Sequence, residues 1–279
     1  MGRSTSWGDF MHRRAGITMV AALAALMALP LSAAAASNLV STRGNGLQLR
    51  NNSISGNWAG YVDVPATGHK ITSVTGRWTV PIAGQQPPGV SSTWTGIGGF
   101  STQDLIQAGT QQVSSPVSDF ITGGPYAAWI ELLPAAPVFI SGCSGDLSCT
   151  VRPGDLMTVT IASPGGSQWS VSMDDFGHWS YTTTETYTST ESSAEWIHEA
   201  PSLAGVLPIP VGNSGTVTFD GDNTFGLDGS SSQLDIAAPQ GSPTATDALP
   251  VETTTSALDS DGEGFNVCTY ALSCAPPAS

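Results

Sequence analysis

From Trp58 onward, short segments rich in Val, Ile, Thr, Trp and Tyr alternate with clusters of Gly, Pro, Ser and Asp. Such segments recur about every 8–12 residues, a spacing typical of all-β proteins. No stretch carries the apolar stripe of an amphipathic helix. Many short strands without crossover helices predict antiparallel sheets packed as a sandwich. The expected strands are Trp58–Val64, Ser73–Val80, Thr93–Gly98, Leu105–Gln112, Ala127–Leu133, Leu156–Ala162, Trp169–Asp174, Trp179–Tyr187, Ala194–Glu199, Gly215–Phe219 and Phe265–Tyr270.

The segments outside this pattern set the expected domain organisation. Residues 37–55 are polar and lack periodicity, so they are interpreted as a linker or short pro-segment. Residues 220–264 are acidic and rich in Ser, Thr and Gly, which predicts long surface loops. We see no internal repeat and no domain break, so residues 56–271 are expected to form one domain, followed by a C-terminal tail at 272–279.

Residues 1–36 are interpreted as a secretory signal peptide. Arg13 and Arg14 precede an apolar run from Ala15 to Leu31, and small residues follow up to an expected cleavage site after Ala36. A membrane anchor is the alternative, but the run is near the lower limit of about 17 residues for a spanning helix. No other segment is apolar enough to cross a bilayer. The mature chain is therefore expected to be secreted, without membrane contact.

The charge balance excludes a nucleic-acid partner. The chain has 8 Lys and Arg against 22 Asp and Glu, and every basic residue lies within the first 152 positions. Phosphate binding needs clustered cations, which this chain lacks. Removing residues 1–36 takes away three Arg and one Asp and leaves 5 basic and 21 acidic residues. A chain with few cations repels itself little in acid, which fits an acid-secreted protein or a merely soluble anionic one.

Four cysteines form two close pairs, Cys143 with Cys149 and Cys268 with Cys274. Three disulfide connectivities are possible in an exported chain, and the local one is favoured. Zinc binding is the rival interpretation, but Cys-x5-Cys without a nearby His lacks the usual ligand spacing. We therefore expect disulfides and no metal.

The usual nucleophile and metal motifs are missing. There is no Gly-x-Ser-x-Gly elbow, and the three His of the mature chain show no ligand spacing. No cofactor is expected, and the remaining candidates for catalytic groups are carboxylates and amides.

Some predicted strands carry polar side chains where apolar ones are usual. Period 2 places Gln107 on a face with small or apolar neighbours, and Glu131 between Trp129 and Leu133. Glu195 and Glu199 share a face about 13 Å apart, too far to act as a direct pair. From this pattern alone, each is more simply a satisfied or solvent-facing polar residue.

Five motifs follow one another along these segments: Asn57-Trp58-Ala59-Gly60-Tyr61, Trp94-Thr95-Gly96-Ile97-Gly98-Gly99, Leu105-Ile106-Gln107-Ala108-Gly109, Tyr126-Ala127-Ala128-Trp129-Ile130-Glu131 and Ala194-Glu195-Trp196-Ile197-His198-Glu199-Ala200-Pro201. In this order they resemble the successive motifs of the glutamic peptidases, the eqolisins, over about residues 55–271. The resemblance implies a concanavalin-like sandwich of two antiparallel sheets and a secreted endopeptidase that cleaves polypeptides at acid pH. It also implies a catalytic dyad of Gln107 and Glu199.

Two positions depart from the family pattern. The fungal members carry an Asp where Gly98 stands, so a supporting carboxylate is absent or comes from elsewhere. His198 replaces a typically apolar residue, and strand alternation should point it to the face opposite Glu199. Residues 37–55 are also shorter than the basic pro-segment of the fungal members, which leaves the mode of activation open.

Under this resemblance, metal-free peptide hydrolysis needs a base for water and a donor for the oxyanion. A Glu199 with an ordinary pKa of about 4.3 is partly ionised at pH 3–4 and can take the proton of water. Gln107 can hold that water and donate to the oxyanion, so the two side chains should lie within reach of one water. Glu131 is expected to orient the site, and Trp94, Trp129 and Trp58 to contact substrate.

Two other functions remain open from the sequence. A glycoside hydrolase would use Glu131 and Glu199 at about 5–5.5 Å or 6.5–9.5 Å. A carbohydrate-binding sandwich would use exposed Trp and Tyr without needing Gln107. A monomer is the default expectation in each case.

Overall fold

The structure is a computed structural model, and it describes residues 57–65, 67–84, 86–114, 123–203, 207–208, 211–220, 236–238, 253–260, 262 and 264–278. The predicted signal peptide, residues 1–36, and the predicted linker, residues 37–55, lie outside the described residues. Within those residues, no helix has the length and apolar character needed to cross a membrane.

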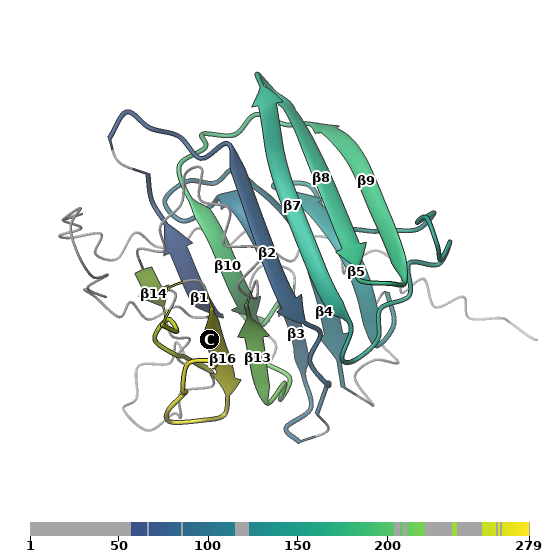
Figure 1. Cartoon of the computed structure of the whole chain (residues 1–279), viewed down its shortest axis with the longest axis vertical. Coiled ribbons are helices and arrows are strands. Elements are labelled where there is room, and N and C mark those ends of the chain that lie inside the picture. The colour runs from purple at the N-terminus through teal and green to yellow at the C-terminus, as the bar shows by residue number, and fades with distance from the viewer. Residues whose placement is uncertain are drawn as a thin grey trace, which may run out of the picture.

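The described residues form two antiparallel sheets of seven strands each and a short ribbon of β11 (Ser202–Leu203) and β12 (Leu207–Pro208). Figure 1 shows one sheet lying in front of the other. The predicted all-β sandwich of two antiparallel sheets is confirmed. The first sheet has the order β14 (Ile236–Ala238), β1 (Trp58–Asp63), β10 (Ala194–Glu199), β3 (Val90–Gly98), β4 (Leu105–Val113), β5 (Tyr126–Leu132) and β6 (Val138–Phe139). The second has the order β15 (Thr253–Thr255), β16 (Phe265–Thr269), β13 (Thr216–Phe219), β2 (Ser73–Thr79), β7 (Leu156–Gly165), β8 (Gln168–Asp175) and β9 (Trp179–Thr186).

Each predicted strand is present, with ends that differ by at most a few residues. The sequence missed the short strands β6, β11, β12, β14 and β15. Two of these, β14 and β15, lie inside residues 220–264, so the prediction of loops alone is wrong there. Both are three-residue strands at sheet edges, too short to show period 2.

The main core lies between the two sheets. Trp78, Trp196 and Tyr61 are fully buried there, and Phe219 stacks on Phe265 with ring centroids 4.8 Å apart. Burial of such a ring stabilises the fold by about 2–3 kcal/mol. Strands β2, β7 and β8 alternate between buried and more exposed residues, whereas every residue of β3, β4 and β10 is buried. The middle of the first sheet is therefore covered on both faces.

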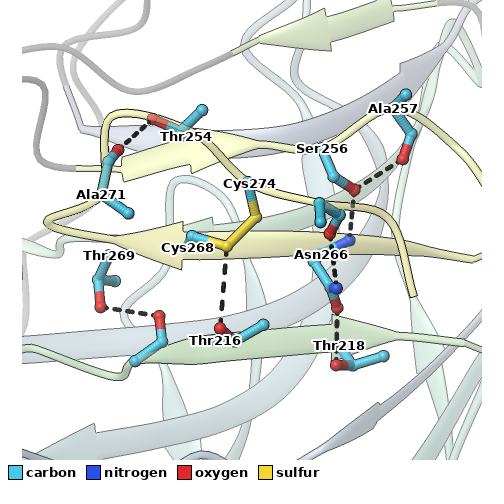
Figure 2. Close-up of a disulfide and its surroundings, with 12 residues drawn as sticks. Thr216, Thr218, Thr254, Ser256, Ala257, Asn266, Cys268, Thr269, Ala271 and Cys274 are labelled. Atoms are coloured by element: carbon cyan, nitrogen blue, oxygen red, sulfur yellow. Dashed lines mark hydrogen bonds between the residues drawn. A yellow bond between two sulfur atoms is a disulfide. The ribbon is translucent and has the colours of Figure 1, made fainter. Parts of the chain in front are cut away.

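Both predicted disulfides are formed, which confirms the local pairing. Cys143 pairs with Cys149, and Cys268 of β16 pairs with Cys274, with Cα atoms 5.4 Å and 5.6 Å apart. Figure 2 shows the second bridge beside Asn266, whose Nδ2 donates to the Ala275 carbonyl. The predicted C-terminal tail is thus tied back onto β16.

Candidate active site

The outer face of the first sheet, which is the face turned away from the second sheet, carries a buried group of one amide and three carboxyls. The residues next to them along each strand, such as Ile106, Ala108, Ile130 and Trp196, belong to the core between the sheets. Strand alternation therefore directs the polar group outward. Its members are Gln107, Glu131, Glu195 and Glu199, all less than a tenth exposed.

Strand register arranges this group in rows across the sheet. Gln107 of β4 pairs with Glu131 of β5 on one side and with Gly96 of β3 on the other. Gly96 in turn pairs with Glu195 of β10. Glu199 lies four residues further along β10 than Glu195. Between the row of paired residues that contains Gln107 and the row that contains Glu199 lies one further row on the same face, which contains Trp94. Gln107 and Glu199 thus share a face but stand on strands separated by β3.

Gln107 is fixed by Glu131. The Gln107 Nε2 donates a hydrogen bond of 2.6 Å to Glu131 Oε2, and both side chains are 1% exposed. Burial raises the pKa of Glu131 to about 8, and the charge of Glu199 adds to this rise, while the bond from Gln107 opposes it. In acid, Glu131 is therefore neutral and holds the amide of Gln107 in one orientation.

Glu199 is held by two side-chain N–H donors. Asn57 Nδ2 donates to Oε1 at 2.6 Å, and Trp94 Nε1 donates to Oε2 at 2.9 Å. Burial raises the pKa of Glu199 to about 7, although the bond from Trp94 favours the ionised form. The sequence-based assumption of an ordinary pKa is therefore wrong, because the strand is covered on both faces.

Glu195 is the third buried carboxyl of the outer face. Its Oε1 accepts a bond of 3.0 Å from Ser193 Oγ. Burial raises its pKa to about 8. Like Glu131, Glu195 is therefore neutral in acid.

Asn57 is a site residue to which the sequence interpretation gave no role. It lies directly before β1, where the pairing of Trp58 with Glu199 brings its amide to the carboxylate. The signal was its place in the motif with Trp58, but the contact depends on a pairing between residues 142 positions apart.

The tryptophans expected to contact substrate gather on this same face. Trp58, Trp94 and Trp129 belong to a second apolar cluster, separate from the main core. Gly109 makes room for Trp94, since a Cβ added to Gly109 would lie 2.5 Å from the Trp94 Cβ. Gly96 makes room for Gln107, because a Cβ there would lie 3.1 Å from the Gln107 Cβ.

The two departures from the family pattern have structural explanations. Gly98 has φ of +84°, and a Cβ there would approach the Asp104 carbonyl oxygen to 2.4 Å, so a side chain would be strained. His198 lies on the face opposite Glu199, as alternation predicted, and its Nδ1 is 3.0 Å from Thr93 Oγ1. It therefore belongs to the interior between the sheets.

Comparison of the sequence with models of protein families identifies the family to which the chain belongs. Residues 56–261, most of the chain, match the sequence model of the Peptidase A4 family. The chain belongs to the Peptidase A4 family. The resemblance to glutamic peptidases seen in the motifs is thereby confirmed. As a Peptidase A4 member, it is a glutamic-type endopeptidase with polypeptide substrates. This membership replaces the glycoside hydrolase and the carbohydrate-binding sandwich as explanations of the site.

Solved structures of the Peptidase A4 type share the fold. Scytalido-glutamic peptidase with a transition state analog inhibitor is 19% identical with a TM-score of 0.56. SCP-B, a member of the eqolisin family in a complex with the tripeptide Ala-Ile-His, is 15% identical with a TM-score of 0.50. Each match covers 78% of this chain and 100% of the other. No curated protein matches the sequence.

The indole N–H on Glu199 makes a first prediction for this peptidase. Trp94→Phe removes the donor to Oε2, so the pKa of Glu199 should rise further. A hydrogen bond to a charged group contributes about 1.5–3 kcal/mol, so we expect kcat/KM to fall about 10- to 100-fold. Profiles of kcat/KM against pH should show the acid limb displaced to higher pH. Trp169→Phe, which removes an indole bond to the Tyr187 carbonyl on the second sheet, is the control and should leave the limb in place.

Proposed function

We propose that this peptidase is secreted and acts in acidic surroundings, with Glu199 as general base and then general acid, and Gln107 as oxyanion donor. The observation that carries the proposal is the pair of N–H donors on Glu199. Asn57 and Trp94 each donate to one of its two carboxyl oxygens and so favour the ionised form, on the same face that carries Gln107.

The reaction follows from these two groups. Ionised Glu199 takes a proton from water, and the resulting hydroxide attacks the carbonyl carbon of the scissile peptide. The oxyanion that forms accepts a hydrogen bond from Gln107 Nε2, one of whose two hydrogens is directed to Glu131. Glu199 then gives its proton to the leaving nitrogen, the C–N bond breaks, and Glu199 is ionised again. Gln107 does not titrate, so its donor function is independent of pH.

The raised pKa of Glu199 locates the working range more closely. With its pKa raised to about 7, Glu199 is mostly neutral in strong acid. We therefore expect kcat/KM to rise with pH from pH 3 to pH 6. The working range is then weakly acidic rather than strongly acidic.

Secretion is supported by the two disulfides. Disulfides form and persist in oxidising compartments outside the cytosol, and both cysteine pairs of this chain are bridged. The predicted signal peptide at residues 1–36 is consistent with this location.

Digestion of a denatured protein across pH 2–8, with pepstatin present, tests the proposal. Cleavage should persist, because the proposed dyad pairs one carboxyl with an amide, whereas aspartic peptidases use two carboxyls that share a proton. It should also increase from pH 3 to pH 6. Complete inhibition by pepstatin, or a rate that is highest at pH 2–3 and falls steadily above it, would contradict the assignment of Glu199 as base.

A further inference from the structure

We propose that the second sheet carries a binding site for one divalent cation of the zinc class, formed by Asp155, Asp175 and His178. The three ligand atoms, one from each residue, all lie within 4.8 Å of one another. The site is separate from the peptidase chemistry, since its residues belong to the β7–β8–β9 part of the second sheet rather than to the outer face of the first.

Strand pairing brings the three residues together. Asp155 directly precedes β7, Asp175 ends β8, and His178 directly precedes β9. Figure 1 shows that β7 begins, β8 ends and β9 begins at the same end of the front sheet. The backbone there is firmly bonded, with Phe176 N donating to the Leu156 carbonyl and His178 N to the Asp175 carbonyl. The ligands are therefore presented by rigid elements.

The distances fit a compact coordination sphere. His178 Nδ1 lies 3.2 Å from Asp175 Oδ1 and 3.7 Å from Asp155 Oδ1. Tetrahedral bonds of about 2.0–2.1 Å place ligand atoms about 3.3 Å apart, so these spacings suit Zn²⁺. An imidazole among the ligands favours zinc-class ions over Mg²⁺ or Ca²⁺, which prefer oxygen alone.

Burial supplies the second, independent observation. The Asp175 side chain is fully buried, and its Oδ2 accepts no hydrogen bond from any described residue. Asp155 is 7% exposed, and its Oδ2 accepts from the Arg152 backbone N–H at 2.6 Å. A buried carboxylate oxygen without a donor is costly, and a bound cation removes that cost.

The imidazole of His178 lies on the solvent-facing side of the site. The His178 side chain is 49% exposed, whereas the two carboxyls lie beneath it. A cation could therefore reach the carboxylates from solvent and keep a water as its fourth ligand. Such an ion would tie the start of β7 to the β8–β9 turn.

No local pattern in the sequence indicates this site. The His residues show no ligand spacing, and Asp155 is 20 positions from Asp175. The trio forms because Met157 of β7 pairs with Asp175 of β8, and Asp175 pairs with Trp179 of β9.

Metal titration of the full chain tests the proposal. The chain is treated with EDTA, dialysed, and titrated at pH 7.5 with Zn²⁺ by calorimetry and with Co²⁺ by visible absorption. At this pH Asp175 is available as a carboxylate, since its pKa is raised only to about 6, by burial and by the neighbouring Asp155, while the bond from His178 lowers it. We expect one Zn²⁺ per chain, a rise in Tm on binding, and Co²⁺ bands of a tetrahedral site.

Variants separate a metal site from an internal ion cluster. His178→Gln, at a half-exposed side chain, should fold, weaken Zn²⁺ binding by more than about tenfold and abolish the Co²⁺ bands. Asp175→Asn should do the same. His69→Gln, at another exposed His, is the control and should bind as the parent does. Equal Co²⁺ spectra in His178→Gln and the parent, or no Zn²⁺ uptake by the parent, would overturn the proposal and leave an Asp–His ion cluster. Peptidase activity should be unchanged in His178→Gln, so this result is independent of the catalytic assignment.

Discussion

Glu199→Gln should lower kcat by about 1,000-fold or more while the chain remains folded. The amide keeps the size of the side chain but cannot take the proton of water, and general base catalysis contributes about 100- to 10,000-fold. The loss should appear in kcat rather than in KM, because substrate contacts on the outer face are unchanged. Steady-state kinetics on a quenched peptide substrate, with circular dichroism to verify folding, measure the effect.

Glu195→Gln is the matched control for this variant. Glu195 lies on the same strand and the same face, is equally buried, and undergoes the same isosteric change. We expect it to keep kcat within about tenfold of the parent. An active, folded Glu199→Gln, or an equal loss in Glu195→Gln, would show that Glu199 is not the base.

Gln107→Ala tests the other half of the proposed dyad. Removing one oxyanion donor costs about 100- to 1,000-fold in kcat, and the variant also leaves Glu131 without its amide partner. Gln111→Ala truncates another buried Gln on the same strand and face, whose Nε2 donates to the Gly124 carbonyl, and should cost far less. Similar losses in both variants would indicate a general disturbance of β4 instead of a specific donor.

Local sequence pattern was sufficient to identify the longer strands and the faces of their side chains, but not the strands of two or three residues. Period 2 placed Glu131 between Trp129 and Leu133 and pointed His198 away from Glu199, and the structure agrees. These predictions succeeded because alternation is a property of each strand by itself.

The contacts within the site depend on neighbours that are distant in sequence. The bond from Gln107 to Glu131 requires β4 to pair with β5 in one register, and the bond from Asn57 to Glu199 requires β1 to pair with β10. A shift by one residue would turn each side chain to the other face. The raised pKa of Glu199 likewise depends on burial of both faces of the sheet, which no local pattern reveals.

The free energy of unfolding should be greatest near pH 4–5 and fall towards pH 8. Burial raises the pKa of Glu131 and Glu195 to about 8 and that of Glu199 to about 7, all above the unfolded value of 4.5. Below pH 4.5 both states are protonated, so these groups do not oppose folding. As the pH rises from 4.5 to 8, these groups ionise in the unfolded chain before they ionise in the folded chain. Ionisation therefore favours the unfolded state, and the free energy of unfolding falls. Each pKa unit corresponds to about 1.4 kcal/mol, so several kcal/mol are lost over this window.

His198 should limit stability on the other side of the maximum. Burial lowers its pKa from 6.5 to about 3, and among the described residues its Nε2 has no hydrogen-bond partner. Between pH 6.5 and pH 3, His198 is therefore protonated in the unfolded chain but neutral in the folded chain. The free energy of unfolding falls as the pH drops through this range. The pKa of Asp175 is also raised, to about 6, so four carboxyls act against one imidazole, and the decline towards pH 8 should be the larger of the two.

Thermal unfolding from pH 3 to pH 8 measures both effects. We expect Tm to be about 10 °C or more higher at pH 4–5 than at pH 8, since 1 kcal/mol shifts Tm by about 2–4 °C in a domain of this size.

His198→Val should remove most of the decline between pH 4.5 and pH 3, whereas His69→Val, at an exposed position, should leave the profile unchanged. A Tm that increases steadily from pH 3 to pH 8 would contradict the raised pKa values. Identical profiles in the parent and His198→Val would contradict the role of the buried imidazole.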